Sequence, residues 1–522
     1  MPNRLASRGH LAPYLASVVL LATGCHATVK DRLLHGDLAA KKDHCASLVQ
    51  APAQGLSSAL AAYEEQLAKR TGVWVLEDGA GAMVSRAWLA ENALKSIDVQ
   101  YFIFSSDNVG LIAIDYLIQA AKRGVKVRLL IDDLLYDTDA ELLQLMDAQE
   151  NLEVRVYNPN LKTGKSLPVA LTKAAMDFRG ANQRMHNKTF IVDGQAVITG
   201  GRNIADEYFD FNTQFNFRDR DVLLLGEAVA QVSRSFDQFW SDKRSAQVTG
   251  LMGPADPKVA QRFASQLRRY ACDPNNFRTS TRKRISQVPL VFQQLAATNE
   301  LHWVDDVVFV SDDPGKNPGK EGLGGGGLAT TTLIEIVRAA KKRIVIQTPY
   351  LITTSLGEKL FQETTKRGVQ VIIMTNSLPT TDGLAAHRGY QRVRSKLLAA
   401  GVELYEFRPD ARIRRDLMSS AQVRSMRKLP IYSLHAKTMV VDDELLVIGT
   451  FNLDPRSANL NTECVVLIPS AAAARGVLDW IEQEIKPENS LRVTEKDNGD
   501  RFAPWTLRFR TWLAGFVPAA IL

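Results

Sequence analysis

The chain has 522 residues, of which 45% are hydrophobic and 23% are charged. These fractions are ordinary for a globular protein and exclude collagen-like, low-complexity and largely disordered chains. Lysine and arginine number 64 against 57 for aspartate and glutamate, so the formal net charge is +7. This charge permits an anionic partner, either nucleic acid or an acidic membrane surface, without choosing between them. Four cysteines are too few for a disulfide framework, and no Cys-x-x-Cys pair indicates a zinc site.

The N-terminus has the pattern of an export signal. Arg4 and Arg8 precede a short apolar stretch that ends in Ala22-Thr23-Gly24-Cys25. The stretch is shorter than the roughly 20 residues that span a bilayer. A basic start, a short apolar region and small residues before a cysteine resemble a bacterial lipoprotein signal. This predicts a signal peptide over 1–24, lipidation of Cys25 and a membrane-anchored, periplasm-facing protein of the cell envelope. The alternative is an uncleaved anchor with an incidental cysteine.

The chain repeats a strand–helix–strand pattern. Apolar strands are predicted near 97–102 and 344–349, and each is followed by a helix that ends in Lys-Arg-Gly-Val. A second strand follows directly in both cases, at 126–131 and 370–374. Glycine after basic residues is typical of a helix C-terminus. Each copy therefore predicts a βαβ unit in a parallel or mixed sheet.

The clearest repeat is a polar motif that recurs at a constant offset of 249 residues. The corresponding residues are His186 and His435, Lys188 and Lys437, Asp193 and Asp442, and Asn203 and Asn452. The residues after each lysine are β-prone, and alternate residues of a strand face the same side. We therefore expect each histidine and its lysine to point into one shared cleft. The aspartate falls on the opposite face, which favours an orienting or structural role within the catalytic motif.

Two copies of this motif suit the chemistry of a phosphodiester. Lysine and asparagine stabilise charge on phosphoryl oxygens, and two imidazoles with a pKa near 6.5 can divide the nucleophile and acid roles. Because the lysines supply the charge that a divalent cation would otherwise provide, we expect no metal and no cofactor. The alternative, that these are ordinary histidines, fits a lone residue better than a matched pair.

His-x-Lys-x4-Asp followed by Gly-x-x-Asn is the signature of the phospholipase D superfamily, which this sequence resembles over nearly all of its length after the signal. The resemblance implies an α/β protein of two similar phospholipase-D-like halves, with mixed sheets packed together and the active site at their interface. The expected divisions are an N-terminal segment at 25–70, a first half at 71–265, a connecting segment at 266–300, a second half at 301–488 and a C-terminal tail at 489–522. Within the second half, Gly and Pro residues from Pro314 to Gly327 predict a mobile loop.

The resemblance also implies a carboxylate partner for each histidine. Glu463 fits this role after the second motif, and Asp219 and Asp221 are both candidates after the first, because spacing does not decide between them. The expected substrate-binding residues are Asn203, Asn452, Thr450, Glu463 and Asp219. The family often has serine after the motif glycine. Thr450 keeps that hydroxyl, whereas Gly201 lacks it.

Four segments of the sequence resemble those of bacterial cardiolipin synthases, and they lie at 201–209, 375–382, 387–390 and 401–405. The similarity is greatest to the subgroup without two N-terminal transmembrane helices. This implies phosphatidyl transfer that forms cardiolipin through a phosphohistidine. The implied substrates are phosphatidylglycerol with phosphatidylethanolamine or a second phosphatidylglycerol. His186 is the implied nucleophile and His435 the acid and base, although the reverse assignment stays open. The alternatives are a phospholipase-D-type hydrolase, a nuclease or a non-catalytic membrane scaffold.

Two further segments have open interpretations. His387 either contacts substrate or is a solvated loop residue. The tail from Pro504 to Pro518 contains two tryptophans, two phenylalanines and two arginines. It is either an interfacial segment on a membrane or a helix packed on the enzyme body. We expect phospholipids and a membrane surface as partners and no nucleic acid, and the sequence leaves the oligomeric state open.

Overall fold

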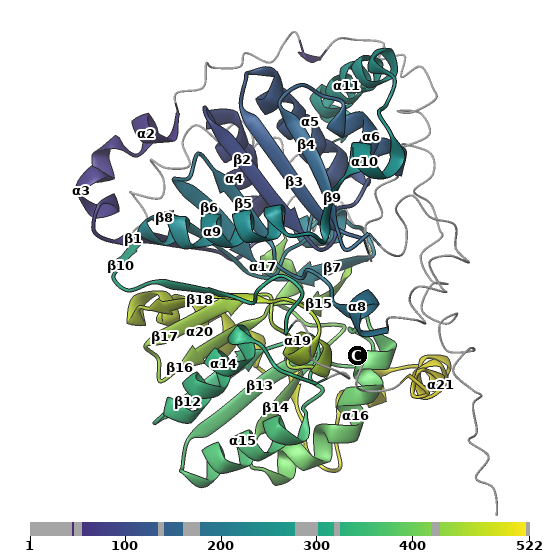
Figure 1. Cartoon of the computed structure of the whole chain (residues 1–522). Coiled ribbons are helices and arrows are strands. Elements are labelled where there is room, and N and C mark those ends of the chain that lie inside the picture. The colour runs from purple at the N-terminus through teal and green to yellow at the C-terminus, as the bar shows by residue number, and fades with distance from the viewer. Residues whose placement is uncertain are drawn as a thin grey trace, which may run out of the picture.

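The computed structural model describes residues 44–45, 55–133, 140–159, 178–276, 301–317, 324–418 and 428–517. The predicted signal peptide and Cys25 lie outside these residues. Figure 1 shows two α/β halves, the first in purple to teal and the second in green to yellow. Both halves are built on a mixed sheet, as predicted.

The first sheet has nine strands in the order β10-β1-β8-β6-β5-β2-β3-β4-β9. They are β1 (Thr71–Leu76), β2 (Ser96–Tyr101), β3 (Lys126–Asp132), β4 (Leu152–Tyr157), β5 (Thr189–Val192), β6 (Ala196–Gly200), β8 (Asp221–Gly226), β9 (Ser245–Gln247) and β10 (His302–Val304). The predicted βαβ unit is confirmed, since β2 and β3 are parallel and α5 (Asn108–Lys122) joins them. One face packs against α4 (Gly79–Asn92), α5, α6 (Ala140–Asp147), α10 (Val248–Met252) and α11 (Pro257–Cys272).

The second sheet has eight strands in the order β11-β18-β17-β16-β12-β13-β14-β19. They are β11 (Val308–Ser311), β12 (Arg343–Gln347), β13 (Gln370–Asn376), β14 (Glu403–Phe407), β16 (Thr438–Val441), β17 (Leu445–Gly449), β18 (Cys464–Pro469) and β19 (Ser490–Arg492). Its outer face packs against α14 (Leu328–Ala339), α15 (Ser355–Lys366) and α16 (Leu384–Ala399). The glycines of the two Lys-Arg-Gly-Val segments have φ of +92° at Gly124 and +86° at Gly368, which is the predicted left-handed helix end.

The two halves share a hydrophobic core. Helices α9 (Glu227–Ser241) and α20 (Ala471–Glu484) contribute to it together with residues from both sheets, including Val222 and Val440. A two-stranded sheet also crosses the interface, because β7 (Phe215–Arg218) of the first half pairs in parallel with β15 (Ile431–Leu434) of the second. Backbone hydrogen bonds between the halves therefore fix their relative position next to the motifs.

The structure moves three predicted boundaries. Helix α11 packs against α5, so the first half continues past residue 265. Strand β10 pairs with β1, so residues 302–304 belong to the first sheet although the sequence placed them in the second half. Strand β19 pairs with β14, so the second half extends past residue 488. In each case strand pairing or helix packing, which composition does not encode, sets the limit.

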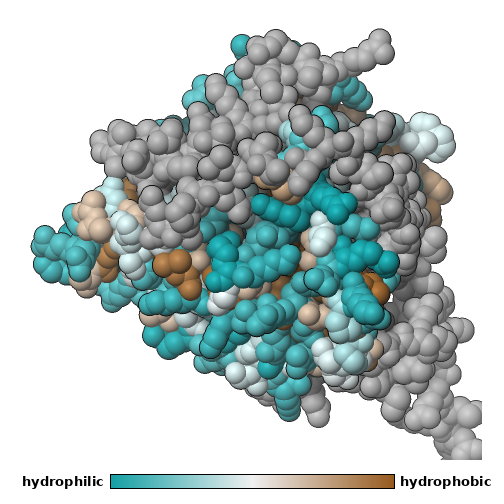
Figure 2. All heavy atoms as spheres, turned by 90° about the horizontal axis from the view of Figure 1, so that it is seen from above, coloured by the Kyte–Doolittle hydropathy of each residue, from teal (hydrophilic) through white to brown (hydrophobic). Residues whose placement is uncertain are grey.

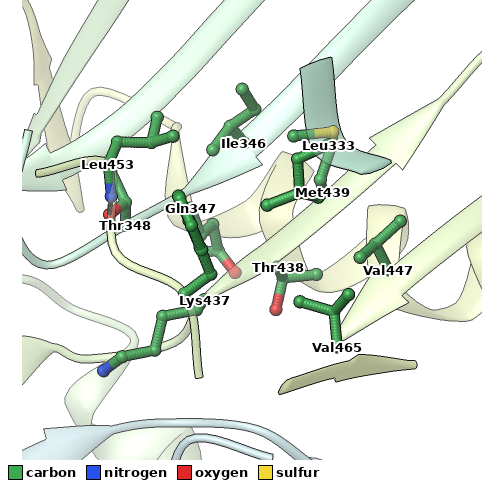
Figure 3. Close-up of a pocket in the computed structure, with 11 residues that line it drawn as sticks. Leu333, Ile346, Gln347, Thr348, Lys437, Thr438, Met439, Val447, Leu453 and Val465 are labelled. Carbon is green, nitrogen blue, oxygen red and sulfur yellow. Dashed lines mark hydrogen bonds between the residues drawn. The ribbon is translucent and has the colours of Figure 1, made fainter. Parts of the chain in front are cut away.

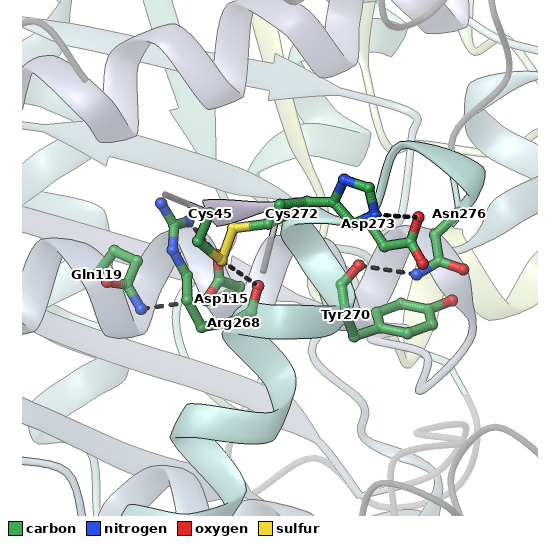
Figure 4. Close-up of a disulfide and its surroundings, with 9 residues drawn as sticks. Cys45, Asp115, Gln119, Arg268, Tyr270, Cys272, Asp273 and Asn276 are labelled. Carbon is green, nitrogen blue, oxygen red and sulfur yellow. Dashed lines mark hydrogen bonds and ion pairs between the residues drawn. A yellow bond between two sulfur atoms is a disulfide. The ribbon is translucent and has the colours of Figure 1, made fainter. Parts of the chain in front are cut away.

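One disulfide joins Cys45 to Cys272 at the end of α11 (Figure 4). The two cysteines are 227 residues apart in the sequence, so their spacing does not predict that they pair. Cys464, in the described part of the chain, is free and buried. No helix within the described ranges combines the length and the apolar character needed to cross a bilayer.

Candidate active site

The two motifs lie at the start of equivalent strands. β5 follows Lys188 directly and β16 follows Lys437, as the sequence predicts. Lys188 donates from Nζ to the carbonyl of His186 (2.7 Å), and Lys437 donates to the carbonyl of His435 (2.6 Å). Both histidines and both lysines are buried. The motif backbone therefore holds each ammonium group beside its own imidazole. Figure 3 shows the Lys437 side chain pointing away from the apolar residues Leu333, Met439 and Val465.

Each histidine is bonded to a carboxylate from the opposite half. His186 Nδ1 lies 2.8 Å from Oε2 of Glu463, and His435 Nδ1 lies 2.6 Å from Oδ2 of Asp219. The interface makes both pairs possible, because His186 N donates to Thr462 O and His435 N donates to Arg218 O. The site is therefore complete only where the two halves meet.

Strand register identifies the equivalent carboxylates. Gly200 pairs with Asp221 across β6 and β8, and Gly449 pairs with Val465 across β17 and β18. The residue two positions earlier is Asp219 in one half and Glu463 in the other. Asp221 has a different role, because it pairs with Arg86 at 2.8 Å.

The residue after the motif glycine differs between the halves for a steric reason. Thr450 donates from Oγ1 to Glu463 Oε2 and accepts from the backbone N of Cys464. When Glu463 is ionised its Oε2 can only accept, so His186 Nδ1 is then the donor to it, which leaves Nε2 of His186 with the free lone pair. At Gly201, a Cβ atom would lie 2.1 Å from Oδ1 of Asp219. The shorter carboxylate occupies the space that a serine side chain needs.

The two motif asparagines differ in their contacts. Asn203 accepts from the backbone N of Ile103 and donates to the hydroxyl of Tyr208, so both ends of its amide are engaged in the protein. Oδ1 of Asn452 is buried and has no hydrogen-bond partner among the described residues. Asn452 is thus the better placed of the two to meet a ligand.

Asp193 and Asp442 lie on the far side of the motif strands. Asp193 accepts hydrogen bonds from the backbone N atoms of Leu94, Lys95 and Ser96. Asp442 accepts from the equivalent amides, those of Lys341, Lys342 and Arg343. Both carboxylates therefore fasten the strand to the preceding helix end, and neither makes a contact with the histidine or lysine of its motif.

Burial and mutual repulsion shift the pKa values of the cations. Burial lowers the pKa of His186 well below 6.5, and the charges of Lys188 and Lys437 lower it further. Burial and the charge of Lys437 lower the pKa of Lys188 to about 7. Burial likewise lowers the pKa of Lys437 to about 8, against the attraction of Asp219. An anion bound at this point relieves the repulsion, so the site is suited to a phosphoryl group.

The two carboxylates are shifted in opposite directions. Burial raises the pKa of Glu463 to about 7. Burial also opposes ionisation of Asp219, but His435 and Lys437 hold its pKa below the usual 3.8. Burial and Lys437 lower the pKa of His435, whereas Asp219 raises it. His435 therefore has a fully ionised partner that favours its protonated form, and His186 does not.

The sequence missed a buried charge network beside the site. Arg218 pairs with Glu77 (2.6 Å) and with Glu484 of the second half (2.5 Å). Arg220 pairs with Glu77 and donates to Gln347 and Thr438 of the second half. These arginines flank Asp219 in the sequence. Their only sequence signal is the charged run Arg-Asp-Arg-Asp in front of an apolar strand.

Lys316 is a second residue that the sequence missed. The predicted mobile loop is wrong for its described first part, because Lys316 is fully buried, pairs with Asp312 (2.8 Å) and donates to Ser457 O. Asp312 accepts from the backbone N of Glu463 at 3.0 Å. The loop thereby supports the partner of His186.

His387 has a structural contact. It is buried, and its Nε2 lies 3.1 Å from Oδ1 of Asp500. The solvated alternative is therefore wrong, and the bond ties α16 to the segment before the C-terminal helix. Across the ranges that the structure describes, no group of three or more His, Cys, Asp or Glu residues is arranged to hold a metal ion.

The two-half fold, with a histidine and a lysine from each half at one composite site, defines a phospholipase-D-like protein. Residues 89–240 and 333–485 match the family described as "Cardiolipin synthase, PLD-like domain", and the chain belongs to this family.

Individual relatives agree with this assignment. The chain is 34% identical over 460 residues to cardiolipin synthase C of Escherichia coli (strain K12), which covers 84% of this chain and 94% of that protein. It is 26% identical over 428 residues to cardiolipin synthase 1 of Bacillus anthracis, over 81% of this chain and 68% of that protein. Among solved structures, phosphatidylserine synthase of Haemophilus influenzae Rd KW20 has the same fold. Its TM-score is 0.56 at 14% sequence identity, over 88% of this chain and 99% of that one.

The Asp219–His435 pair leads to a pH prediction. In Asp219→Asn the carboxylate charge that raises the pKa of His435 is lost, so this pKa falls further. If protonated His435 is the acid, the alkaline limb of kcat/KM moves to lower pH by about one unit or more, and kcat falls about 10²–10⁴-fold. The measurement is a pH profile of the wild type and the variant. If the alkaline limb has the same pKa in Asp219→Asn as in the wild type, the limb reports the titration of a group other than His435. Asp237→Asn, on the exposed face of α9, is the control and should leave the profile unchanged.

Proposed function

We propose that the protein transfers a phosphatidyl group from one phospholipid to an alcohol of another and so forms cardiolipin, through a phosphohistidine on His186. The observation that carries the proposal is the pair of histidine–carboxylate contacts across the interface. With Glu463 ionised, Nε2 of His186 is left with its lone pair, and Asp219 offsets part of the lowering that burial and Lys437 impose on the pKa of His435. These environments support His186 as the nucleophile and His435 as the acid.

The proposed reaction has two displacements. Nε2 of His186 attacks phosphorus, a P–N bond forms, the P–O bond to the head group breaks, and His435 gives its proton to the departing oxygen. The hydroxyl of a second phospholipid then gives its proton to His435 and attacks phosphorus, which breaks the P–N bond and releases His186. Lys188 and Lys437, with Nδ2 of Asn452 as a hydrogen-bond donor, stabilise the charge on the phosphoryl oxygens.

The substrates proposed are phosphatidylglycerol as acceptor, with phosphatidylethanolamine or a second phosphatidylglycerol as donor. The named relatives are cardiolipin synthases, which supports the product. Water in place of the lipid alcohol would give phosphatidic acid instead.

The test is product analysis with the purified protein and vesicles whose two phospholipids carry distinguishable acyl chains. Mass spectrometry should detect cardiolipin with chains from both lipids, together with release of ethanolamine or glycerol that identifies the donor. The His435→Ala variant is the inactive control. Phosphatidic acid without cardiolipin would show that the reaction is hydrolysis and not transfer. The absence of both products would favour a scaffold or a nuclease. Cleavage of a single-stranded DNA substrate would then distinguish the nuclease from the scaffold.

Export and lipidation at Cys25 are part of the same proposal. The Cys45–Cys272 disulfide supports them, because disulfides persist in oxidising compartments such as the periplasm. Protein isolated from its native membrane under denaturing, non-reducing conditions should expose Cys464 to alkylation and keep Cys45 and Cys272 protected. Alkylation of Cys45, Cys272 and Cys464 would argue for a reducing compartment. Detection of a Cys25 peptide without lipid would contradict the proposed lipid anchor.

A further inference from the structure

The C-terminal helix α21 (Trp505–Ala514) and the two residues after it carry most of the large apolar side chains that are exposed in the described structure. Among the residues that the structure describes, nine large hydrophobic side chains are exposed, and five of them lie between residues 505 and 516. Their exposed fractions are Trp505 76%, Phe509 52%, Trp512 53%, Leu513 46% and Phe516 62%. Phe509 stacks on Trp512 with ring centroids 6.0 Å apart, and Trp512 lies 5.7 Å from Phe516. Phe509, Trp512 and Phe516 thus form one continuous row, and Trp505 lies four residues before it on the same helix.

The helix is attached by polar contacts that leave this row uncovered. Asp500, just before α21, pairs with Arg394 and His387 of α16, and Arg392 donates to Gly515 O at its end. Within the helix, Thr511 is the buried residue. The helix does pack on the enzyme body through α16, which is the alternative left open by the sequence, but this contact leaves the aromatic side chains exposed.

The charge of the segment is one-sided. Residues 505–516 contain Arg508 and Arg510, both exposed, and no aspartate or glutamate. The face of the first half seen from above has a different character, since its visible described residues are mainly hydrophilic with scattered hydrophobic ones (Figure 2). Aromatic residues beside arginines are typical of segments that lie in the interface of an anionic bilayer.

We propose that α21 is the surface through which the protein docks on an anionic phospholipid bilayer. A second copy of the chain is the other occupant that an apolar row suggests, but a twofold contact would bring the arginines of both copies together without an acidic residue in the segment to neutralise them. A bilayer of anionic lipid supplies both the apolar phase and the opposite charge.

The position of α21 relates docking to the active site. The helix packs against α16, as Figure 1 shows, and α16 begins two residues after Asp382. The charge of Asp382 acts on the pKa of both His435 and Lys437, so this end of α16 lies close to the motif residues. Docking through α21 therefore holds the site near the membrane that contains its substrates. This last step rests on the proposed function, whereas the docking itself does not.

Fluorescence quenching tests docking on the full chain, whatever other attachment it has. Vesicles with brominated anionic phospholipid should quench Trp505 and Trp512, so that Trp505→Phe and Trp512→Phe each lose part of the quenched signal. Trp74→Phe, a partly buried tryptophan of β1, is the control and should leave the quenched fraction unchanged. Quenching that is the same in all three variants and the wild type would overturn the proposal.

Kinetics separate docking from catalysis. The double variant Phe509→Ser/Trp512→Ser should raise the apparent KM for vesicle phospholipids at least about tenfold, with kcat unchanged and with full activity on short-chain phospholipids below their micellar concentration. The matched control is Leu356→Ser on α15, which is 53% exposed like Trp512. Arg510→Gln should weaken docking on anionic vesicles but not on neutral ones. The loss of affinity caused by this substitution should be smaller at high salt, where the charge of the arginine is screened.

Each other outcome has a definite meaning. An equal KM for the double variant and the control would overturn docking through α21. A dimer that the double variant abolishes, without any change in vesicle binding, would assign the surface to a second copy. Tryptophan quenching in a protein that is inactive on both kinds of substrate would leave docking supported and remove the proposed function.

Discussion

His186→Ala is expected to lower kcat at least about 10⁴-fold and to prevent any covalent adduct, because the proposed nucleophile is absent. His435→Ala is expected to be equally slow with natural phospholipids, whose head group leaves only with a proton. The two variants should differ with a phosphatidyl p-nitrophenyl ester. Nitrophenolate leaves without a proton, so His435→Ala should release one equivalent in a burst and then stop, since no base activates the second alcohol.

The measurement is the burst amplitude, followed by mass spectrometry of peptides from the rapidly denatured protein. The adduct should lie on the peptide that contains His186. A burst from His186→Ala, with the adduct on His435, would reverse the assignment. The control is His302→Gln on β10, at the edge of the first sheet, which should keep wild-type turnover.

The surroundings of His186 and His435 differ more in the structure than the two sequence motifs do. The two motifs have the same residues at the same spacing, and from them the histidines are interchangeable. Their carboxylates are not, because Glu463 accepts from Thr450 and has a pKa raised by burial to about 7, whereas Asp219 stays ionised beside His435 and Lys437. The two histidines therefore differ because each is bonded to a different carboxylate, which comes from the opposite half.

The parts predicted correctly are those with a local signal. The repeated strand–helix–strand units and the motif strands follow from residue alternation and from glycines at helix ends, which depend on near neighbours. From the sequence, Asp219 is only one of two candidates, because the choice depends on the register between β6 and β8. The Gly-rich surroundings of Lys316 are typical of a mobile loop and predict one. The burial of Lys316 depends on Asp312 and Ser457, which are contacts of the folded chain.

The pairing within the charge network between the halves could not be predicted, since Glu77 and Glu484 lie far from Arg218 and Arg220 in the sequence. Burial opposes ionisation of Glu77, yet Arg220 and Arg218 lower its pKa to about 2. The arginines therefore keep Glu77 charged at neutral pH. The stabilisation from this lowered pKa is fully present above about pH 4.5 and is lost as the pH falls toward 2. The network also touches catalysis, because Arg218 O accepts from the backbone N atoms of His435 and Ala436.

Glu484→Gln should destabilise the protein by about 3–5 kcal/mol, because it removes one partner of a buried ion pair and leaves Arg218 incompletely compensated. Glu484 is fully buried on α20, where it accepts from Arg218 and Gln347. Thermal unfolding followed by circular dichroism should show a clearly lower Tm. Arg475→Gln on the same helix breaks exposed ion pairs with Asp479 and Glu482, and we expect no measurable change in Tm.

A paired substitution separates stability from positioning. Replacing a buried ion pair by apolar residues of similar size is often neutral or stabilising, so Arg218→Met/Glu484→Leu should recover much of the Tm that Glu484→Gln loses. The backbone carbonyl of residue 218 remains in the double variant, but the side chain that fixes it between Glu77 and the second half is gone. We therefore expect the double variant to have a kcat below that of the wild type even though its Tm recovers, because the peptide that holds His435 is less well fixed. Recovery of kcat together with Tm would show that the network acts on stability alone, and that β7 and β15 position His435 without it.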